Sequence, residues 1–419
     1  MSKKNFVLSR LVEEDLQGLS PIQTIMKMAE DRNIRKMDLD PKNVISFGGG
    51  WCNHKAPKEL VEVYSEIVSD EDLFHKSGRY SAIIGDYKCR EQLSRFEKEI
   101  YGLSGLKPDN ILIGQSSTQL FHDVLRVISN PGDFVGLLDP TYANYINSVK
   151  CAVPSSKIKF VPALDSDSWE YMSEPDCSLE VLKKYCENGL KNLIMPVPDN
   201  PTSQIPDDRF IKGCIEVLDD YNGFLVLDYA YKALWFGDMP KAFSFSPIDH
   251  PNLILINSNS KWLSSLGRRF GWVEADEKIV KSLEKLNESV LLSPDTMHSM
   301  ATSSFLEKTL ENNSLKKYIE NTRKLYKNTS EVMIKNLDKF LGWNRLEPMG
   351  GLYAVSPTPN GKEPVSFVEN VLKNTGVLLI PGAGFGPSME KAVRLSFGPL
   401  CYDHDKIREG FERIHRYLF

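Results

Sequence analysis

A lysine at the end of an apolar run is the residue of this sequence with the most chemistry to offer. Lys261 follows residues 253–256, Leu-Ile-Leu-Ile, and a short polar stretch. The run has the length and branching of a buried strand, which predicts that Lys261 stands where a core strand gives way to a loop. Burial disfavours the ammonium form and makes the nucleophilic amine accessible, as a Schiff-base lysine requires. Taken alone, Lys261 fits a solvated loop lysine equally well.

Hydroxyls and a guanidinium surround this lysine in the sequence. Ser258 and Ser260 precede it, and Ser264 and Arg269 follow it. Together they offer the donors and the positive charge that an anionic ligand needs. The stretch therefore predicts an amine beside an anion site.

A second anion site is predicted where another apolar run meets a helix start. Residues 110–119 read Asn-Ile-Leu-Ile-Gly-Gln-Ser-Ser-Thr-Gln, which indicates a strand, a glycine turn and a helix onset. A phosphate at such an N-terminus meets free backbone N–H groups, the positive end of the dipole and the hydroxyls of Ser116 and Thr118, with Ser117 between them. Serine and threonine also cap ordinary helices, and the Gly-Lys-Ser/Thr of a nucleotide-binding loop is missing.

A carboxylate ends a third apolar run. Residues 223–231 read Gly-Phe-Leu-Val-Leu-Asp-Tyr-Ala-Tyr, so Asp228 stands at the carboxyl end of a predicted strand. Such an acid points into the crevice where open α/β sheets bind ligands. Alone, such an acid is as readily the cap of a helix.

These stretches resemble, in content and order, the fold-type-I pyridoxal-phosphate (PLP) enzymes of the class I and II aminotransferases. Ser-x-Ser-Lys followed by Gly-x-Arg-x-Gly, within residues 258–271, is similar to the family's cofactor-lysine signature, although Leu266 stands where many members have proline. The resemblance implies that Lys261 forms the internal aldimine with PLP. It implies that Ser258 and Arg269 bind the phosphate together with the turn at residues 116–118.

Other motifs follow the family's order and imply further cofactor and substrate contacts. Tyr142, after Asp-Pro-Thr, matches the aromatic that stacks on the pyridine ring. Asn200, in Asn-Pro-Thr-Ser, and Tyr231 match the partners of the ring oxygen, while Asp228 matches the acid at the ring nitrogen. Arg394 matches the arginine that grips the substrate α-carboxylate. Alone, each residue also fits an ordinary loop or strand position.

Two more segments imply contacts at the edge of the site. The glycine run at residues 48–50 ends in Gly50 and Trp51, which the resemblance places beside the substrate, although a flexible turn fits too. Tyr80 matches a tyrosine that reaches the cofactor phosphate of the other subunit, or it is a packed surface aromatic. The resemblance therefore implies a homodimer with active sites at its interface.

Composition limits the class of protein. With 419 residues, 41% hydrophobic and 26% charged, the chain is long enough for a large core and a second domain. A formal charge of −5 without a basic run predicts no nucleic-acid partner. No signal-peptide core or membrane-length apolar run is apparent, so we expect a soluble cytoplasmic protein without membrane partners. Seven scattered cysteines without a Cys-x-x-Cys pair predict neither a disulfide framework nor a metal site.

The resemblance and the alternation of strands and helices together predict an α/β fold. We expect a large domain with a mixed, mostly parallel sheet flanked by helices, plus a smaller α+β domain. The expected division is residues 1–43 as an N-terminal arm and part of the small domain, 44–305 as the large PLP-binding domain, and 306–419 as the small C-terminal domain with its linking helix. Apolar spacing also predicts one helix near residues 22–33 and one long helix over 305–341.

The predicted activity is an aminotransferase that moves the amino group of an amino acid to a 2-keto acid through the Lys261 aldimine. The same residues would serve β-elimination, cyclisation or oxygen-dependent oxidation of an amino acid, which remain alternatives. A cofactor-sensing transcription regulator on this fold would need an added basic domain, for which the residues before the first glycine run are too few.

The substrate side chain is predicted from one local resemblance. Residues 293–298, Ser-Pro-Asp-Thr-Met-His, resemble a segment that relatives place near the partner's active site, and this puts Ser289 where aspartate-type members carry an arginine. A buried carboxylate without a cation costs several kcal/mol, so we expect a dicarboxylic amino acid to be a poor donor. Trp51 and Tyr142 suit an apolar or aromatic side chain, whereas Glu288 suits a cationic one, and both remain open.

Overall fold

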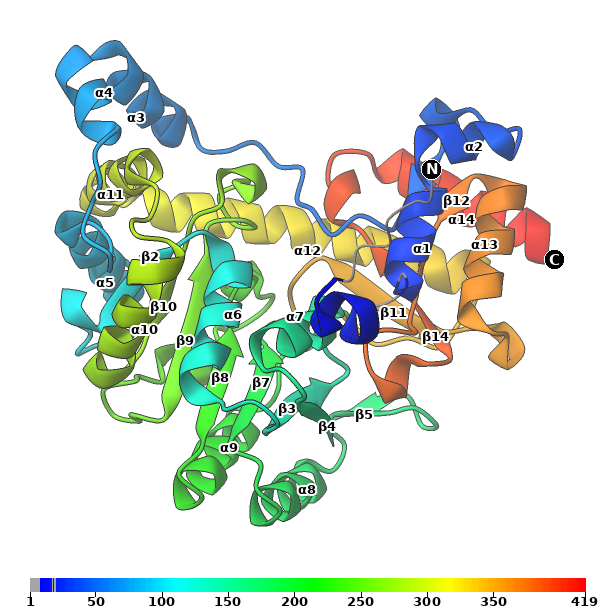
Figure 1. Ribbon diagram of the computed structural model, residues 1–419. Helices are drawn as coiled ribbons and strands as arrows, with labels where there is room; N and C mark the ends of the chain where they lie inside the picture. The colour runs from blue at the N-terminus through cyan, green and yellow to red at the C-terminus, as the bar shows by residue number, and fades with distance from the viewer. Residues whose placement is uncertain (1–7, 17, 19) are drawn as a thin grey trace, which may run out of the picture.

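A central sheet organises the larger part of the molecule. The computed structural model describes residues 8–16, 18 and 20–419, and its main sheet has seven strands in the order β2-β10-β9-β8-β7-β3-β4 (Figure 1). These strands are β2 (Ile111–Gly114), β3 (Phe134–Asp139), β4 (Lys157–Pro162), β7 (Asn192–Pro196), β8 (Phe224–Asp228), β9 (Leu253–Ser258) and β10 (Gly271–Glu274). Adjacent strands are parallel except β10, which runs antiparallel to β2 and β9. The predicted mixed, mostly parallel sheet is confirmed.

The strands are apolar because helices cover both faces of the sheet. Every residue of β7 and β9 is buried, as expected for strands that carry helices on each side. Successive residues alternate between two cores: Leu225 and Leu227 of β8 belong to one, and Val226 belongs to the other. The helices around the sheet are α3 (Lys58–Ser69), α4 (Glu71–Ser77), α5 (Tyr87–Tyr101), α6 (Ser116–Ile128), α7 (Asn144–Ala152), α8 (Pro175–Glu187), α9 (Asp208–Asp220), α10 (Glu277–Val290) and α11 (Thr296–Glu311).

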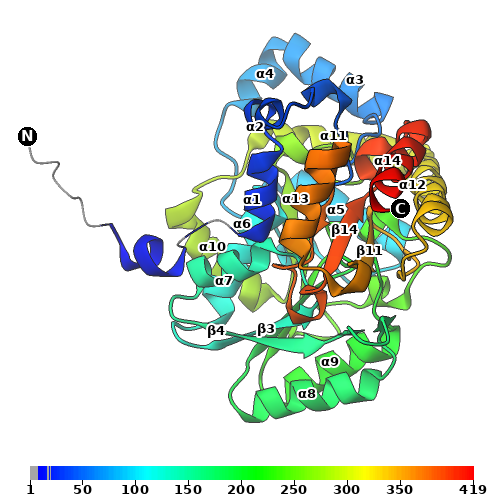
Figure 2. The same ribbon diagram turned by 90° about the vertical axis from the view of Figure 1, so that its right-hand side faces the viewer.

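A second core is built from both ends of the chain. It gathers Ile25, Ile34 and Ile45 with Val377 and Phe411, and β1 pairs in parallel with β12. Figure 2 shows α1 beside α13, and the two helices are in contact. The elements of this part are α1 (Pro21–Met28), α2 (Asp31–Lys36), β1 (Ile45–Ser46), α12 (Ser314–Phe340), β11 (Tyr353–Pro357), α13 (Pro364–Thr375), β12 (Val377–Leu378), β13 (Ile380–Pro381), β14 (Ala392–Ser396) and α14 (His404–Leu418). A small hairpin of β5 (Leu164–Asp165) and β6 (Glu170–Tyr171) lies beyond β4.

Two helix predictions were wrong in the same way. The single helix expected over residues 305–341 is interrupted between α11 and α12, where Asn313 adopts a left-handed φ of 58°. The helix expected near residues 22–33 is divided into α1 and α2, because Glu30 takes an extended ψ of 138° before α2. Apolar spacing continues across such breaks, whereas the backbone does not, and asparagine tolerates the left-handed region better than most residues.

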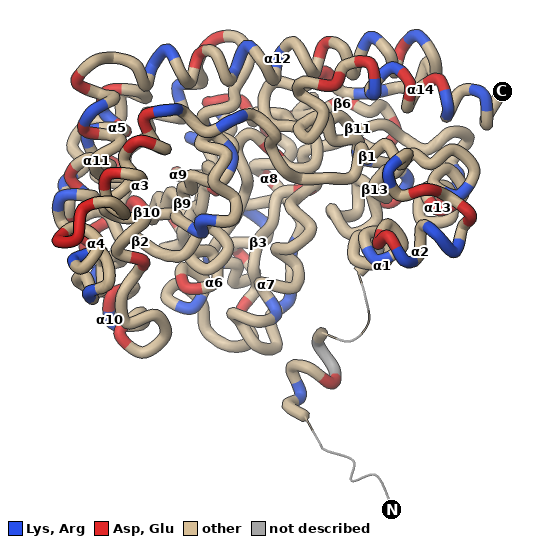
Figure 3. Tube along the Cα trace, turned by 90° about the horizontal axis from the view of Figure 1, so that it is seen from above, with Lys and Arg blue, Asp and Glu red and all other residues tan. Residues whose placement is uncertain are grey.

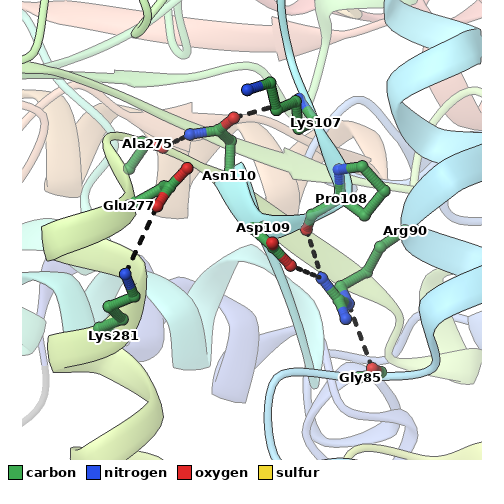
Figure 4. A network of polar contacts seen from close by, with 9 residues as sticks. All are labelled: Gly85, Arg90, Lys107, Pro108, Asp109, Asn110, Ala275, Glu277 and Lys281. Carbon is green, nitrogen blue, oxygen red and sulfur yellow. Dashed lines mark hydrogen bonds and ion pairs between the residues drawn. The ribbon is translucent and has the colours of Figure 1, made fainter.

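A polar network fixes the start of β2, whose far end leads to the predicted phosphate turn. Arg90 of α5 donates from Nε to the Gly85 carbonyl at 3.2 Å and from Nη1 to the Pro108 carbonyl at 2.5 Å (Figure 4). Asn110 donates from Nδ2 to the Ala275 carbonyl at 3.2 Å, just past β10. These bonds anchor the outer strands and the segment that begins at Tyr80.

The charged residues are spread over the outside of the molecule. Figure 3 shows Lys and Arg interspersed with Asp and Glu along outer helices such as α12 and α14. Several of these charges pair at helical spacing, for example Arg408 with Glu412 at 2.9 Å. Among the residues described, none of the helices combines the length and the apolar character needed to cross a bilayer.

Candidate active site

A cavity of about 180 Å³ opens where β7, β8 and β9 end at the carboxyl edge of the sheet. Open α/β sheets bind ligands at this edge. The cavity is lined by Ser117, Thr118, Tyr142, Tyr145, Pro196, Asn200, Asp228, Ala230, Tyr231, Ser260, Lys261, Leu266 and Arg269. The structure therefore brings together residues that the sequence placed in separate motifs.

Four predicted residues outside this lining bond to residues within it. Gly50 accepts from Lys261, Ser116 accepts from Arg269, Ser258 bonds to Ser260, and Arg394 donates to Asn200. Trp51, which follows Gly50, is 42% exposed, and Tyr80 is 81% exposed. Of the predicted site residues, Trp51 and Tyr80 neither line the cavity nor make a described hydrogen bond to a residue that lines it.

Lys261 projects from the loop that follows β9 and is half-buried. Its Nζ donates to the carbonyl oxygen of Gly50 at 2.6 Å and lies 5.4 Å from the centre of the Tyr231 ring. A carbonyl and an aromatic face both attract an ammonium without neutralising it. The amine is therefore held in the lining of the cavity by contacts that a ligand can replace.

The anion end of the cavity lies between the first turn of α6 and the loop before β10. Arg269 donates to the Ser116 hydroxyl at 2.5 Å, and both residues have left-handed φ angles, 50° and 78°. Such conformations in non-glycine residues cost about 1–3 kcal/mol each and gather at functional sites. Gly271 permits this approach, because a Cβ there would lie 2.9 Å from the Ser116 carbonyl carbon. Ser117 and Thr118 then face the cavity from the helix start, where backbone N–H groups are free to bind an anion.

Asp228, the last residue of β8, also lines the cavity and is held by two donors. The Tyr145 hydroxyl donates to Oδ2 at 2.6 Å, and the Ala230 N–H donates to Oδ1 at 2.9 Å. Burial raises the pKa of Asp228 above its usual value, and these bonds and Lys261 act in the opposite direction. Tyr145 itself stacks on Phe121 with ring centres 4.3 Å apart.

Sequence reasoning missed Tyr145. Its signal was available, because it lies three residues after Tyr142, at the start of α7, and both tyrosines line the cavity. What could not be read is that its hydroxyl reaches a carboxylate on β8, since that contact depends on how α7 packs across the sheet.

A buried arginine marks the side of the site nearest the second core. Arg394 donates to Asn200 Oδ1 at 3.0 Å and to the Gly48 carbonyl at 2.9 Å, and its guanidinium carbon lies 4.3 Å from the centre of the Tyr353 ring. It is 5% exposed, and no ion pair joins it to a carboxylate of the described residues. A buried cation without an anionic partner is costly, so this guanidinium is suited to receive a carboxylate from a ligand.

Tyr353 is a second residue that sequence reasoning missed. Its hydroxyl bonds to the Tyr231 hydroxyl at 2.5 Å, and a Cβ added to Gly50 would lie 3.1 Å from it. It therefore connects the predicted ring-oxygen partner, Tyr231, with the glycine run. Tyr353 stands in β11, distant in sequence from every recognised motif, and only the fold brings it here.

The donor set of the cavity fits pyridoxal phosphate. The lining includes the Lys261 amine, the hydroxyls at the start of α6 with the Arg269 guanidinium, the buried Asp228 carboxylate and the ring of Tyr142. These groups correspond to the aldehyde, the phosphate, the ring nitrogen and the ring of the cofactor.

Comparison with known proteins gives full-length relatives. An aspartate aminotransferase of Pyrococcus horikoshii is 25% identical over 395 residues, covering 94% of this chain and 95% of that protein. An LL-diaminopimelate aminotransferase of Natranaerobius thermophilus is 26% identical, covering 93% of this chain and 95% of that protein. An aromatic-amino-acid aminotransferase of Thermococcus litoralis is 26% identical, covering 93% and 91%.

Solved structures give the same fold. A single mutant of the aspartate aminotransferase of Thermus thermophilus superposes with a TM-score of 0.84 at 21% sequence identity, covering 99% of this chain and 100% of that chain. The family described as "Aminotransferase class I and II" matches residues 42–414, which is most of the chain. This chain therefore belongs to the class I and II aminotransferases.

Proposed function

We propose that the cavity at the ends of β7, β8 and β9 is the active site of this PLP-dependent aminotransferase, and that Lys261, Asp228 and Tyr231 are its catalytic residues. The observation that carries this assignment is the convergence of the three side chains on one cavity from the ends of two adjacent strands, β8 and β9. Ser116, Ser117, Thr118, Ser258 and Arg269 would bind the cofactor phosphate, Tyr142 the ring face, and Asn200 and Tyr231 the ring oxygen.

When bound, PLP supplies an electron-accepting ring that stabilises negative charge at the substrate Cα. Asp228 holds its Oδ2 against the Tyr145 hydroxyl and presents a fixed carboxyl group to the ring-nitrogen end of the cavity. Lys261, released from the Gly50 carbonyl, would accept the proton from the substrate Cα at Nζ and would deliver it to the cofactor carbon on the other side of the amino nitrogen. The Tyr231 hydroxyl, bonded to Tyr353, keeps its ring close to this amine.

Substrate binding is assigned to Arg394, Asn200, Gly50 and Trp51. Arg394 presents two N–H donors toward polar acceptors only, and its Nε lacks a protein partner among the described residues, so it can take up an α-carboxylate as a bidentate pair. Asn200 would orient that guanidinium, and the Gly50 carbonyl would exchange its contact with Lys261 for one with the substrate.

The preferred amino-group donor is proposed to lack a second carboxylate. Among the described residues, the cations in the cavity lining are Lys261 and Arg269, and both are assigned above. Ser289 and Glu288 stand at the exposed end of α10 and are outside that lining. The relatives are named for aspartate, LL-diaminopimelate and aromatic amino acids, and five of them are 24% to 27% identical to this chain. Such similar identities do not indicate which substrate side chain this enzyme prefers.

Single-turnover measurements test the substrate class. Aspartate, glutamate, leucine, phenylalanine and arginine are mixed anaerobically with the holoenzyme, and the visible absorption of the cofactor is followed. We expect the two dicarboxylates to react most slowly, and we expect Ser289→Arg to raise the rate with aspartate relative to leucine. Aspartate or glutamate as the fastest donor of the unmodified enzyme would contradict the proposal.

The larger organisation is proposed from the same structure. Residues 44–305 would form the PLP-binding domain and 306–419, with 1–43, the small domain, because the two sets of residues largely populate separate cores. A homodimer is supported by the exposed apolar side chains of α3 and α4, among them Val68 at 58% and Phe74 at 54%, close in sequence to the exposed Tyr80. A cytoplasmic location remains a prediction from the sequence.

A further inference from the structure

A buried carboxylate joins the two sides of the proposed substrate site. Asp139, the last residue of β3, accepts from the Ser388 hydroxyl at 2.9 Å and from the Ser388 N–H at 3.1 Å. Ser388 belongs to a short turn between β13 and β14, Pro387–Met389, far away in the sequence. The contact therefore ties the main sheet to a loop of the second core.

A backbone bond lies beside this contact. The Thr141 N–H donates to the Phe385 carbonyl at 2.7 Å, so residues 139–141 meet residues 385–388 at two points. Gly386, with a φ of 116°, allows this close approach, because a Cβ at that position would overlap the Asp139 carboxylate. The shape of the turn is thus matched to an acid at position 139.

Each of the two segments leads to one half of the proposed site. The first continues directly into Tyr142, which lines the cavity. The second carries Phe385, whose ring centre lies 5.0 Å from the guanidinium carbon of Arg394. Arg394 itself is paired with Ile380 of β13, the strand that precedes this loop. The contact thus spans from the cofactor face to the carboxylate-binding arginine.

Burying an acid at this position lowers the stability of the folded state. Asp139 is 6% exposed, and its carboxylate has hydrogen bonds to Ser388 but no ion pair with a cation of the described residues. Burial, with a smaller contribution from Glu390, raises its pKa to about 6 against the lowering effect of the Ser388 bonds. A hydrophobic or amide side chain would avoid the desolvation cost. Only a carboxylate, however, can accept on both oxygens from one residue.

We propose that Asp139 is a positioning residue that holds the Ser388 turn against the Tyr142 loop and thereby sets Arg394 for binding of the substrate α-carboxylate. The inference rests on the roles proposed above for Arg394 and Tyr142. Asp139 would act through the turn and would not touch the substrate. Its loss should therefore weaken recognition of the carboxylate and leave recognition of the amino group largely intact.

The test compares two ligands of the holoenzyme, an amino acid and the amine that lacks its α-carboxylate. Dissociation constants of phenylalanine and phenethylamine are obtained from the change in visible cofactor absorption. For Asp139→Asn, whose amide nitrogen would replace one of the two accepting oxygens and remove the charge, we expect about tenfold or more weaker phenylalanine binding, as for loss of a hydrogen bond to a charged group. Phenethylamine binding should change by less than about twofold on the same scale. Ser388→Ala should show a smaller shift in the same direction, because its N–H remains.

Two controls separate the possible failures. Asp133 is a half-buried acid just before β3, and its carboxylate accepts a hydrogen bond from the Asn130 N–H. Asp133→Asn should leave the dissociation constants of both ligands unchanged. Arg394→Ala should remove the preference for phenylalanine over phenethylamine; if it does not, the proposed role of Arg394 fails. If Arg394→Ala behaves as expected while Asp139→Asn and Ser388→Ala affect both ligands equally, or neither, the positioning role of Asp139 is overturned.

Discussion

Asp199 is a fully buried acid whose ionisation should be visible in the stability of the whole protein. One oxygen, Oδ2, accepts from the N–H and the hydroxyl of Thr202, and the other, Oδ1, has no protein partner among the described residues. Burial, with a smaller contribution from Asp139, raises its pKa from 3.8 to about 7. The folded state therefore resists ionisation of Asp199 much more than the unfolded state does.

The sign and size of the effect follow from this difference. A pKa that is raised in the folded state leaves stability intact below the unfolded pKa and removes it as the pH rises through the folded pKa. The interval from 3.8 to about 7 corresponds to a total loss of ~4 kcal/mol at about 1.4 kcal/mol per pH unit. About 2.5 kcal/mol of this loss should fall between pH 5 and pH 8.

The substitution Asp199→Asn removes the ionisation and keeps the shape of the side chain. We expect the free energy of unfolding of the variant, measured relative to the unmodified protein, to increase by ~2–3 kcal/mol between pH 5 and pH 8. The assay is urea unfolding followed by circular dichroism at several pH values, at constant ionic strength and with cofactor in excess. If the asparagine amide itself destabilises the fold, it should do so equally at every pH. That effect would shift the variant's free energy of unfolding by a constant amount and would not change the expected increase between pH 5 and pH 8.

The matched control is Asp167→Asn, because Asp167 is exposed. Its unfolding free energy should follow that of the unmodified protein across the range. If Asp199→Asn also runs parallel to the unmodified protein, the carboxylate is better satisfied than its contacts indicate. The reasoning from burial and the unpartnered Oδ1 would then be refuted.

Three other predictions concern the proposed site. Lys261→Ala should abolish turnover, and borohydride reduction of the unmodified holoenzyme should attach the cofactor to the peptide that contains Lys261; attachment elsewhere contradicts the assignment. Asp228→Ala should retain cofactor yet lose rate by orders of magnitude, whereas Arg269→Ala should chiefly weaken cofactor affinity, as measured by equilibrium dialysis. Tyr145→Phe removes the 2.6 Å hydrogen bond to Asp228, which keeps the pKa of Asp228 from rising further. Single-turnover rates should therefore fall about tenfold, as for loss of a hydrogen bond to a charged group. An unchanged rate would show that Asp228 does not need this donor.

The sequence allowed prediction of the residues that stand at strand ends. Asp228 ends a buried strand, and Lys261 and Asn200 follow two others. Parallel strands bring their carboxyl ends to one edge, so the meeting of these residues in one cavity could be expected. Tyr353 and Tyr145 could not be assigned, because their partners are set by packing between elements distant in sequence.

Local geometry was the other limit. The break before α12 depends on the left-handed φ of Asn313, which apolar spacing does not register. Ser116 adopts a similar conformation at the phosphate turn, where a sequence alone suggests an ordinary helix cap. Tyr80 stays a prediction, because its proposed partner belongs to a second subunit.

The pairing of β1 with β12 has a consequence for the order in which the protein folds. Ile45 is synthesised early, and its partner Val377 follows only after most of the chain has been made. At typical translation rates this interval is on the order of tens of seconds. During that time Ile25, Ile34 and Ile45 have no native core to enter, because the rest of their cluster comes largely from the C-terminal third of the sequence. The nascent N-terminal segment therefore keeps these apolar side chains without their native partners until the C-terminal third is made, and exposed apolar surface of this kind favours aggregation.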